Sequence, residues 1–232
     1  MEQNPYQAPS SDLVSTQPSL DKPSIDEAIE RGYDFSIGDI LSQASKKMNG
    51  MKLTYWLALI VYSAITIPIS LIAAFIPGLN YVVGFLLAPL AAGLYFITLN
   101  HLRGKEISVS QLFERCVSKE CFMPIVIAAA LTTLFYILGL LLFIIPGIYL
   151  IVAYLLHQFI IFDNPGISFW EAMEASRKTI TQHWFKVFFL IFLLALINMG
   201  GAMLLMIGLI WTVPLTAMTT AILYETIFGP RA

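Results

Sequence analysis

The residues that could do chemistry are few and scattered. His101, His157 and His183 lie in three different segments, so they do not form a catalytic or metal-binding set by themselves. Cys116 and Cys121 have no histidine close by in the sequence, which makes a metal site at this pair improbable. No motif places a nucleophile with a histidine and an acid. The sequence therefore predicts no catalytic residue, no metal, no cofactor and no enzymatic activity.

Strongly polar residues within apolar stretches are the remaining candidates, because lipid does not solvate them. His157 and Gln158 lie shortly before Asp163, near the end of one such stretch. Asn198 lies deeper in another stretch and precedes a pair of glycines. We interpret these residues as a candidate polar intramembrane site. Two readings stay open for Asn198: a hydrogen bond between helices, which is the simpler, and a ligand position at a helix break. For His157 the simpler reading is a partnered histidine at the interface, and the other is a proton relay.

The elements that must position these residues are long apolar segments. Hydrophobic residues make up 58% of the 232 residues and charged residues only 12%, about half the charged share of a typical soluble protein. Three windows, 54–100, 121–162 and 187–224, contain no Asp, Glu, Lys or Arg. Each is about 40 residues long, and one membrane span needs about 20. The pattern predicts an all-α membrane protein with six transmembrane helices arranged as three hairpins.

The basic residues predict the orientation of the hairpins. All 13 Lys and Arg lie outside the three windows. They are Lys22, Arg31, Lys46, Lys47, Lys52, Arg103, Lys105, Arg115, Lys119, Arg177, Lys178, Lys186 and Arg231. Three hairpins would place every one of them on the same face, which the positive-inside rule makes cytoplasmic. Both termini are then expected in the cytoplasm. A structural disulfide between the two cysteines is not expected there.

The sequence determines the side of the membrane on which the charged loops lie better than it determines how deeply the second and third hairpins insert. The segment 147–162 gives about 24 Å of helix against a hydrocarbon core of about 30 Å, and the third window is short for two spans and a turn. Full crossing is the favoured interpretation for both hairpins, and re-entrant segments that stop short are the alternative.

A repeated pattern precedes each window. An apolar residue is followed by Ser36, Ser108 or Ser168, and an acidic or amide side chain follows three positions later. This arrangement is typical of a capping box, in which the serine and the later side chain bond to each other's backbone N–H groups. It predicts a helix that begins at each serine and carries one apolar stripe. The repeats would be 35–106, 107–166 and 167–228.

These three amphipathic helices could act in two ways, which we weigh equally. They could lie flat on the membrane with the stripe facing down, or they could pack against the ends of the hairpins. In the first case Lys46, Lys47, Arg177 and Lys178 are candidate contacts to lipid headgroups. Residues 1–33 are polar and rich in proline, which predicts a disordered cytoplasmic tail before a membrane domain over 34–228.

Three segments resemble a bacterial family. They are 145–150 (IPGIYL), the Phe162-Asp163 pair, and 171–177 (EAMEASR). They resemble the uncharacterised YciC-like membrane proteins and the membrane domain of some glycerophosphoryl diester phosphodiesterases. The resemblance implies a bacterial membrane protein with a similar layout over about 35–228. It carries no catalytic residue over, because the phosphodiesterase chemistry belongs to a separate soluble domain. The Pro-rich start around residues 4–9 also resembles short leaders on small membrane proteins of Gram-negative bacteria, which implies an inner-membrane setting.

Two functions remain as hypotheses. The first is a non-enzymatic scaffold or accessory protein at the cytoplasmic lipid interface, with membrane lipids and a membrane or cytoplasmic protein as partners. The alternative is a transporter or channel for a small or apolar solute. A net charge of −2 excludes a strongly basic nucleic-acid surface, so no nucleic-acid partner is expected.

Overall fold

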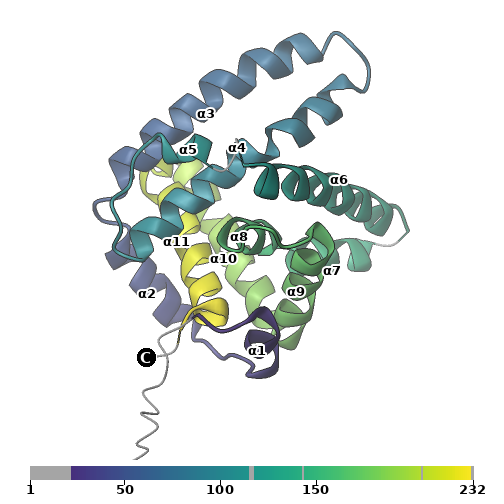
Figure 1. Ribbon diagram of the computed structural model, residues 1–232. Coiled ribbons are helices and arrows are strands. Elements are labelled where there is room, and N and C mark those ends of the chain that lie inside the picture. The colour runs from purple at the N-terminus through teal and green to yellow at the C-terminus, as the bar shows by residue number, and fades with distance from the viewer. Residues whose placement is uncertain (1–21, 115–117, 143, 205, 231–232) are drawn as a thin grey trace, which may run out of the picture.

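All regular structure in the computed structural model is helical over the residues it describes, which are 22–114, 118–142, 144–204 and 206–230 (Figure 1). The helices are α1 (Ile25–Glu30), α2 (Ile37–Lys47), α3 (Lys52–Ala73), α4 (Leu79–Leu102), α5 (Gln111–Glu114), α6 (Lys119–Leu142), α7 (Ile144–Ala153), α8 (His157–Asp163), α9 (Phe169–Gln182), α10 (Trp184–Met203) and α11 (Leu209–Phe228). The predicted all-α class is confirmed.

Within the described residues, five helical segments are long and apolar enough to cross a membrane. They are α3, α4, α6, the combined α7–α8 segment Ile144–Asp163, and α10. The last helix, α11, is not among them although it has 20 residues. Five threonines, Pro214 and Glu225 lower its hydropathy, and much of it is buried by neighbouring helices. The chain is therefore a helical protein with several candidate spans, and the sixth predicted span is the exception.

The outer faces of the candidate spans are apolar and uncovered. Phe75 is 88% exposed, and Leu141 and Ile145 are each 80% exposed. A soluble protein rarely leaves so many large apolar side chains in water, because each loses the free energy of burial. Lipid chains would cover this surface without that cost.

Within each window the chain turns back on itself, so that α3 packs on α4, α6 on the combined α7–α8 segment, and α10 on α11. We call these the first, second and third helix pairs. Near the turns of the second and third pairs, glycines meet backbone to backbone. A Cβ added to Gly139 would lie 2.9 Å from the Cα of Gly147, and one added to Gly208 would lie 2.6 Å from the Cα of Gly201. No side chain fits at these crossings, so the glycines allow both pairs to close tightly.

The pairs are inclined to one another. Trp56, one turn into α3, donates a 3.1 Å hydrogen bond from Nε1 to the carbonyl of Ile210 in the first turn of α11. The start of α3 follows a charged segment, whereas the start of α11 follows the turn of the third pair. In upright full hairpins these two points would be separated by most of a core about 30 Å thick. The contact therefore favours the shallower alternative for the third pair.

Two of the three predicted caps are present. Ser168 forms a complete capping box with Glu171 at the start of α9, as predicted. Ser36 accepts from the backbone N–H of Asp39 at the start of α2, without the return bond of a complete box. The apolar stripes of both helices, including Ile40 and Met173, are buried within the chain. This burial agrees with the packed reading of these helices.

The helix start predicted at Ser108 was wrong. The helix in that segment, α5, begins at Gln111. The Gln111 side chain donates to the carbonyl of Glu106 at 3.1 Å instead of reaching back to Ser108. Ser108 is instead hydrogen-bonded to the hydroxyl of Ser110 at 2.7 Å. A competing local hydrogen bond thus replaces the cap.

The end of the disordered tail was also placed too late. The short helix α1 lies within the predicted tail and has a capping box between Ser24 and Glu27. Ala28 and Tyr33 are buried, and Gln182 of α9 donates to the carbonyl of Ile29 at 2.8 Å. The segment from Lys22 onward is therefore docked on the bundle, and the prediction of disorder for residues 1–21 lies outside the described residues.

Candidate functional site

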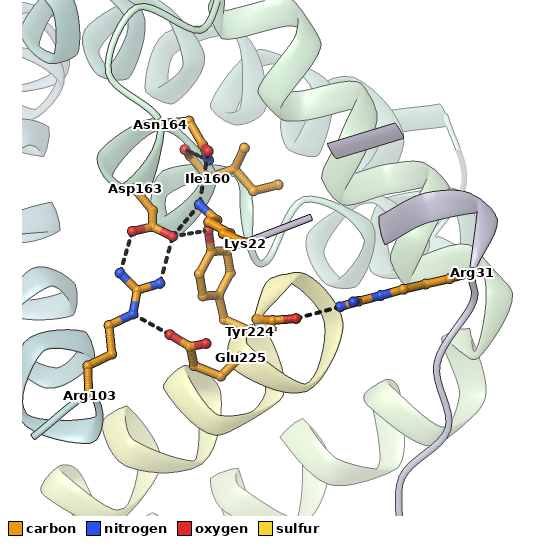
Figure 2. A network of polar contacts seen from close by, with 9 residues as sticks. Lys22, Arg31, Arg103, Ile160, Asp163, Asn164, Tyr224 and Glu225 are labelled. Carbon is orange, nitrogen blue, oxygen red and sulfur yellow. Dashed lines mark hydrogen bonds and ion pairs between the residues drawn. The ribbon is translucent and has the colours of Figure 1, made fainter. Parts of the chain in front are cut away.

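The most extensive polar cluster of the described residues lies where three helices end. Arg103 is the C-cap of α4, Asp163 is the last residue of α8, and Tyr224 and Glu225 lie in the last turns of α11 (Figure 2). These are the return helices of the three pairs. We call this cluster, together with Lys22, the clasp.

Asp163 is the centre of the clasp. Arg103 donates two hydrogen bonds to it, from Nη1 to Oδ1 at 2.6 Å and from Nη2 to Oδ2 at 2.8 Å. The hydroxyl of Tyr224 donates to Oδ2 at 2.8 Å. The Nε of Arg103 donates to Glu225 at 2.5 Å, so one guanidinium joins two acids from two helices. Such paired, planar recognition of carboxylates is the geometry for which arginine is suited.

Lys22 brings the N-terminal segment into the same cluster. Its ammonium group lies 2.5 Å from Asp163 and donates to the side-chain oxygen of Asn164 at 2.9 Å. Arg31 fastens the segment again by donating to the carbonyls of Ile227 and Gly229, at 2.5 and 2.8 Å (Figure 2). A cation at these carbonyls also interacts favourably with the negative end of the helix α11 dipole.

The clasp is largely shielded from solvent. The side chain of Asp163 is 8% exposed, that of Arg103 25% and that of Glu225 20%. Burial by itself lowers the pKa of Arg103, but the hydrogen bonds and charges of Asp163 and Glu225 outweigh it and raise this pKa above its usual value. Arg103 therefore stays charged, and it compensates the buried carboxylate of Asp163.

The clasp has the properties of a structural contact that holds helix ends together. Both oxygens of Asp163 accept hydrogen bonds from donors within the chain, which hold the carboxylate in one orientation. No serine, threonine or cysteine side chain contacts these residues through any of the hydrogen bonds described above, and no metal-binding group of three or more His, Cys, Asp or Glu occurs in the described part of the chain. Its geometry connects three helix pairs and the N-terminal segment.

Asn198 makes the hydrogen bond between helices that was the simpler reading. Its Nδ2 donates to Thr216 of α11 at 2.7 Å and to the carbonyl of Leu194 at 2.9 Å. Helix α10 continues through Gly200 and Gly201 to Met203, so the glycine pair does not break it. Asn198 nevertheless lines a cavity of about 340 Å³, and its Oδ1 is buried without a partner.

His157 and Gln158 do not join Asn198. His157 is 6% exposed, and its Nδ1 lies 2.5 Å from the carbonyl of Tyr154, one turn earlier in the chain. Its Nε2 is buried and has no partner in the described residues. Neither His157 nor Gln158 belongs to the lining of the Asn198 cavity. The three polar residues are thus not one site.

The four candidate headgroup contacts fall into two groups. Lys46 and Lys47 are exposed in the last turn of α2. Arg177 is instead bound to Glu174 by two hydrogen bonds of 2.7 and 2.8 Å, and Lys178 lies 3.7 Å from the same carboxylate. The hydrogen bond from Arg177 is the main cause that lowers the pKa of Glu174. Lys46 and Lys47 are therefore the candidates without such compensation from a nearby acid on their own helix.

The cysteines have different environments. Cys121 is fully buried, with its sulfur 3.8 Å from the carbonyl of Ile161. Cys116 lies outside the described residues.

Sequence reasoning missed the clasp as a unit. From the sequence alone, Arg103 and Asp163 are only polar residues at the ends of apolar stretches, and Glu225 has no predicted role. The available signal is their common position: each lies at or near the C-terminal end of α4, α8 or α11.

The comparisons with known proteins give no identification. No family model matches the chain, and no curated protein or solved structure is significantly similar to it.

Proposed function

We propose that this chain is a multi-pass protein of the bacterial inner membrane that acts without catalysis, as a scaffold or accessory protein at the cytoplasmic lipid interface. The observation that carries the proposal is the clasp. It collects the ends of three helix pairs into one polar face, while the apolar outer surfaces of the spans are left for lipid. A membrane protein with one polar face and apolar outer surfaces exposes its polar side chains on one side of the membrane only.

The orientation follows from the position of the basic residues. With the polar face in the cytoplasm, both termini are cytoplasmic and the apolar turns point outward. We propose three hairpins as copies of one unit, with the first two crossing the bilayer. The third is inclined and shallower, since α11 is less apolar and its start contacts Trp56. The inner-membrane setting rests on the resemblance of the Pro-rich start around residues 4–9 to leaders of small Gram-negative membrane proteins.

The lipid contact is proposed at the end of α2. The exposed Lys46 and Lys47 are directly followed by the start of α3, so their ammonium groups can reach lipid phosphates while the helix remains packed on α11. A protein partner could use the same polar face, where α1, α2 and α9 contribute most of the exposed charge.

The experiment is native mass spectrometry of the protein purified with its lipids. Lys46→Glu combined with Lys47→Glu is expected to remove most bound anionic lipid, because each basic residue near the surface contributes about 1 kcal/mol to such binding. The matched control is Lys105→Glu, another exposed lysine on the same face. Unchanged lipid retention in the double variant, or equal loss in the control, would contradict the proposed contact.

A transporter or channel is the second candidate, and one observation favours it. Asn198 lies in a candidate span and lines a cavity, where transporters place ligands. Asn198→Leu is then expected to abolish solute flux at normal expression, and full flux in that variant would exclude the assignment.

A further inference from the structure

The cavity beside Asn198 is lined by residues from five helices. Tyr55 of α3, Tyr95 of α4, Phe159 of α8, Asn198 of α10 and Thr220 of α11 all line it. The cavity of about 340 Å³ lies within the range of small-molecule sites, which begins near 300 Å³. All three helix pairs contribute to its walls, so the cavity exists only when the pairs are assembled.

Polar groups without protein partners gather around this cavity. The Oδ1 of Asn198 is buried and accepts no hydrogen bond. The hydroxyls of Tyr55 and Tyr95 likewise have no hydrogen-bond partner among the described residues. Thr220 uses its proton on the carbonyl of Thr216, so its oxygen can still accept. Unpaired polar groups inside a membrane protein are costly, and several around one cavity indicate an occupant that pairs with them.

The walls also define what the occupant can be. No Asp, Glu, Lys, Arg or His lines the cavity, so a charged ligand would be left without compensation. Aromatic rings form one side, where Tyr95 and Phe159 have centroids 4.7 Å apart and Phe159 stacks on Tyr224 at 5.4 Å. Such a wall suits an apolar body, and the two tyrosine hydroxyls can each donate to or accept from a hydroxyl or amide.

We propose that this cavity binds an uncharged amphiphile that carries a hydroxyl or amide on an apolar body. The polar group hydrogen-bonds to the tyrosine hydroxyls and Thr220, with a small rotation of Asn198 allowing its Oδ1 to accept as well. The apolar body packs on Phe159. This site does not depend on the proposed lipid contact at Lys46 and Lys47, which lies on α2, and binding does not require transport.

The probe for the test is octanol that carries a diazirine on its chain, and its control is the same diazirine alkane without the hydroxyl. The protein in nanodiscs is photolabelled with each, and the labelled residues are mapped by mass spectrometry. The alcohol is expected to label residues around the cavity, above all Leu155 and Phe159, beside which its chain would lie. The alkane is expected to label mainly the outer faces of the spans.

Tyr95→Phe removes one hydroxyl and keeps the ring, so the bundle should still assemble. It is expected to lower labelling in the cavity by the alcohol about fivefold, the effect of one neutral hydrogen bond. Tyr81→Phe is the matched control, because Tyr81 is exposed near the turn of the first pair. Labelling by the alcohol that equals labelling by the alkane, or that does not fall in Tyr95→Phe, overturns the proposal. Absence of label in the cavity also overturns it and leaves water as the occupant.

Discussion

Asp163→Asn tests the clasp with almost no change in shape. The variant keeps the side-chain volume, but it leaves Arg103 with only Glu225 as an acidic partner and removes the charge opposite Lys22. Loss of one partner of a buried pair costs about 3 to 5 kcal/mol. Because Arg103 keeps Glu225 and is 25% exposed, we expect a smaller loss, about 2 to 3 kcal/mol.

The assay is reversible unfolding in mixed micelles, measured as the free energy of unfolding. A double-mutant cycle with Arg103→Gln isolates the interaction, and we expect a coupling energy of about 2 kcal/mol. Glu174→Gln is the control, because it breaks an ion pair in which Arg177 is 37% exposed, and such pairs contribute about 0 to 1 kcal/mol. The reasoning is refuted if Asp163→Asn costs no more than Glu174→Gln, or if the cycle shows no coupling.

Two further predictions concern the third helix pair. Gly201→Ala should lower the free energy of unfolding by about 2 kcal/mol, because its Cβ would lie 2.9 Å from Oγ1 of Thr212 and 3.1 Å from the backbone carbonyl carbon of Gly208. Gly200→Ala has open space around it and should raise the free energy of unfolding by about 0.5 to 1 kcal/mol, because alanine favours a helix more than glycine does. Equal effects of the two substitutions in the same unfolding assay would contradict the close crossing. Cysteines that replace Trp56 and Ile210, in a chain without its native cysteines, should form a crosslink with a short bifunctional thiol reagent in intact membranes. Upright, separate pairs would give none.

The features that could be predicted from the sequence are those formed by residues close together along the chain, such as helix caps. The capping box at Ser168 needs only Glu171, three positions later, and it is present. The cap at Ser108 failed because Gln111 had another local acceptor, the carbonyl of Glu106. Local patterns therefore narrow the options at a helix start without deciding among them.

The clasp and the inclination of the third pair depend on contacts distant in sequence. Arg103 and Asp163 are 60 positions apart, and Trp56 bonds to a carbonyl 154 positions away. The positions of charged residues in the sequence predict on which side of the membrane they lie, but they do not predict which acidic residue pairs with which basic residue. Hydropathy likewise gives the length of a span and not its tilt.

The central claim is that the clasp face lies in the cytoplasm and the turns of the first two pairs lie outside. It is tested most directly by single cysteines labelled with an impermeant thiol reagent in spheroplasts, with Cys116 and Cys121 replaced. Phe75→Cys and Leu141→Cys lie at the exposed turns, and Lys105→Cys lies on the clasp face. The account predicts labelling of the first two in intact spheroplasts, and of Lys105→Cys only after permeabilisation. Labelling of Lys105→Cys in intact spheroplasts would contradict it.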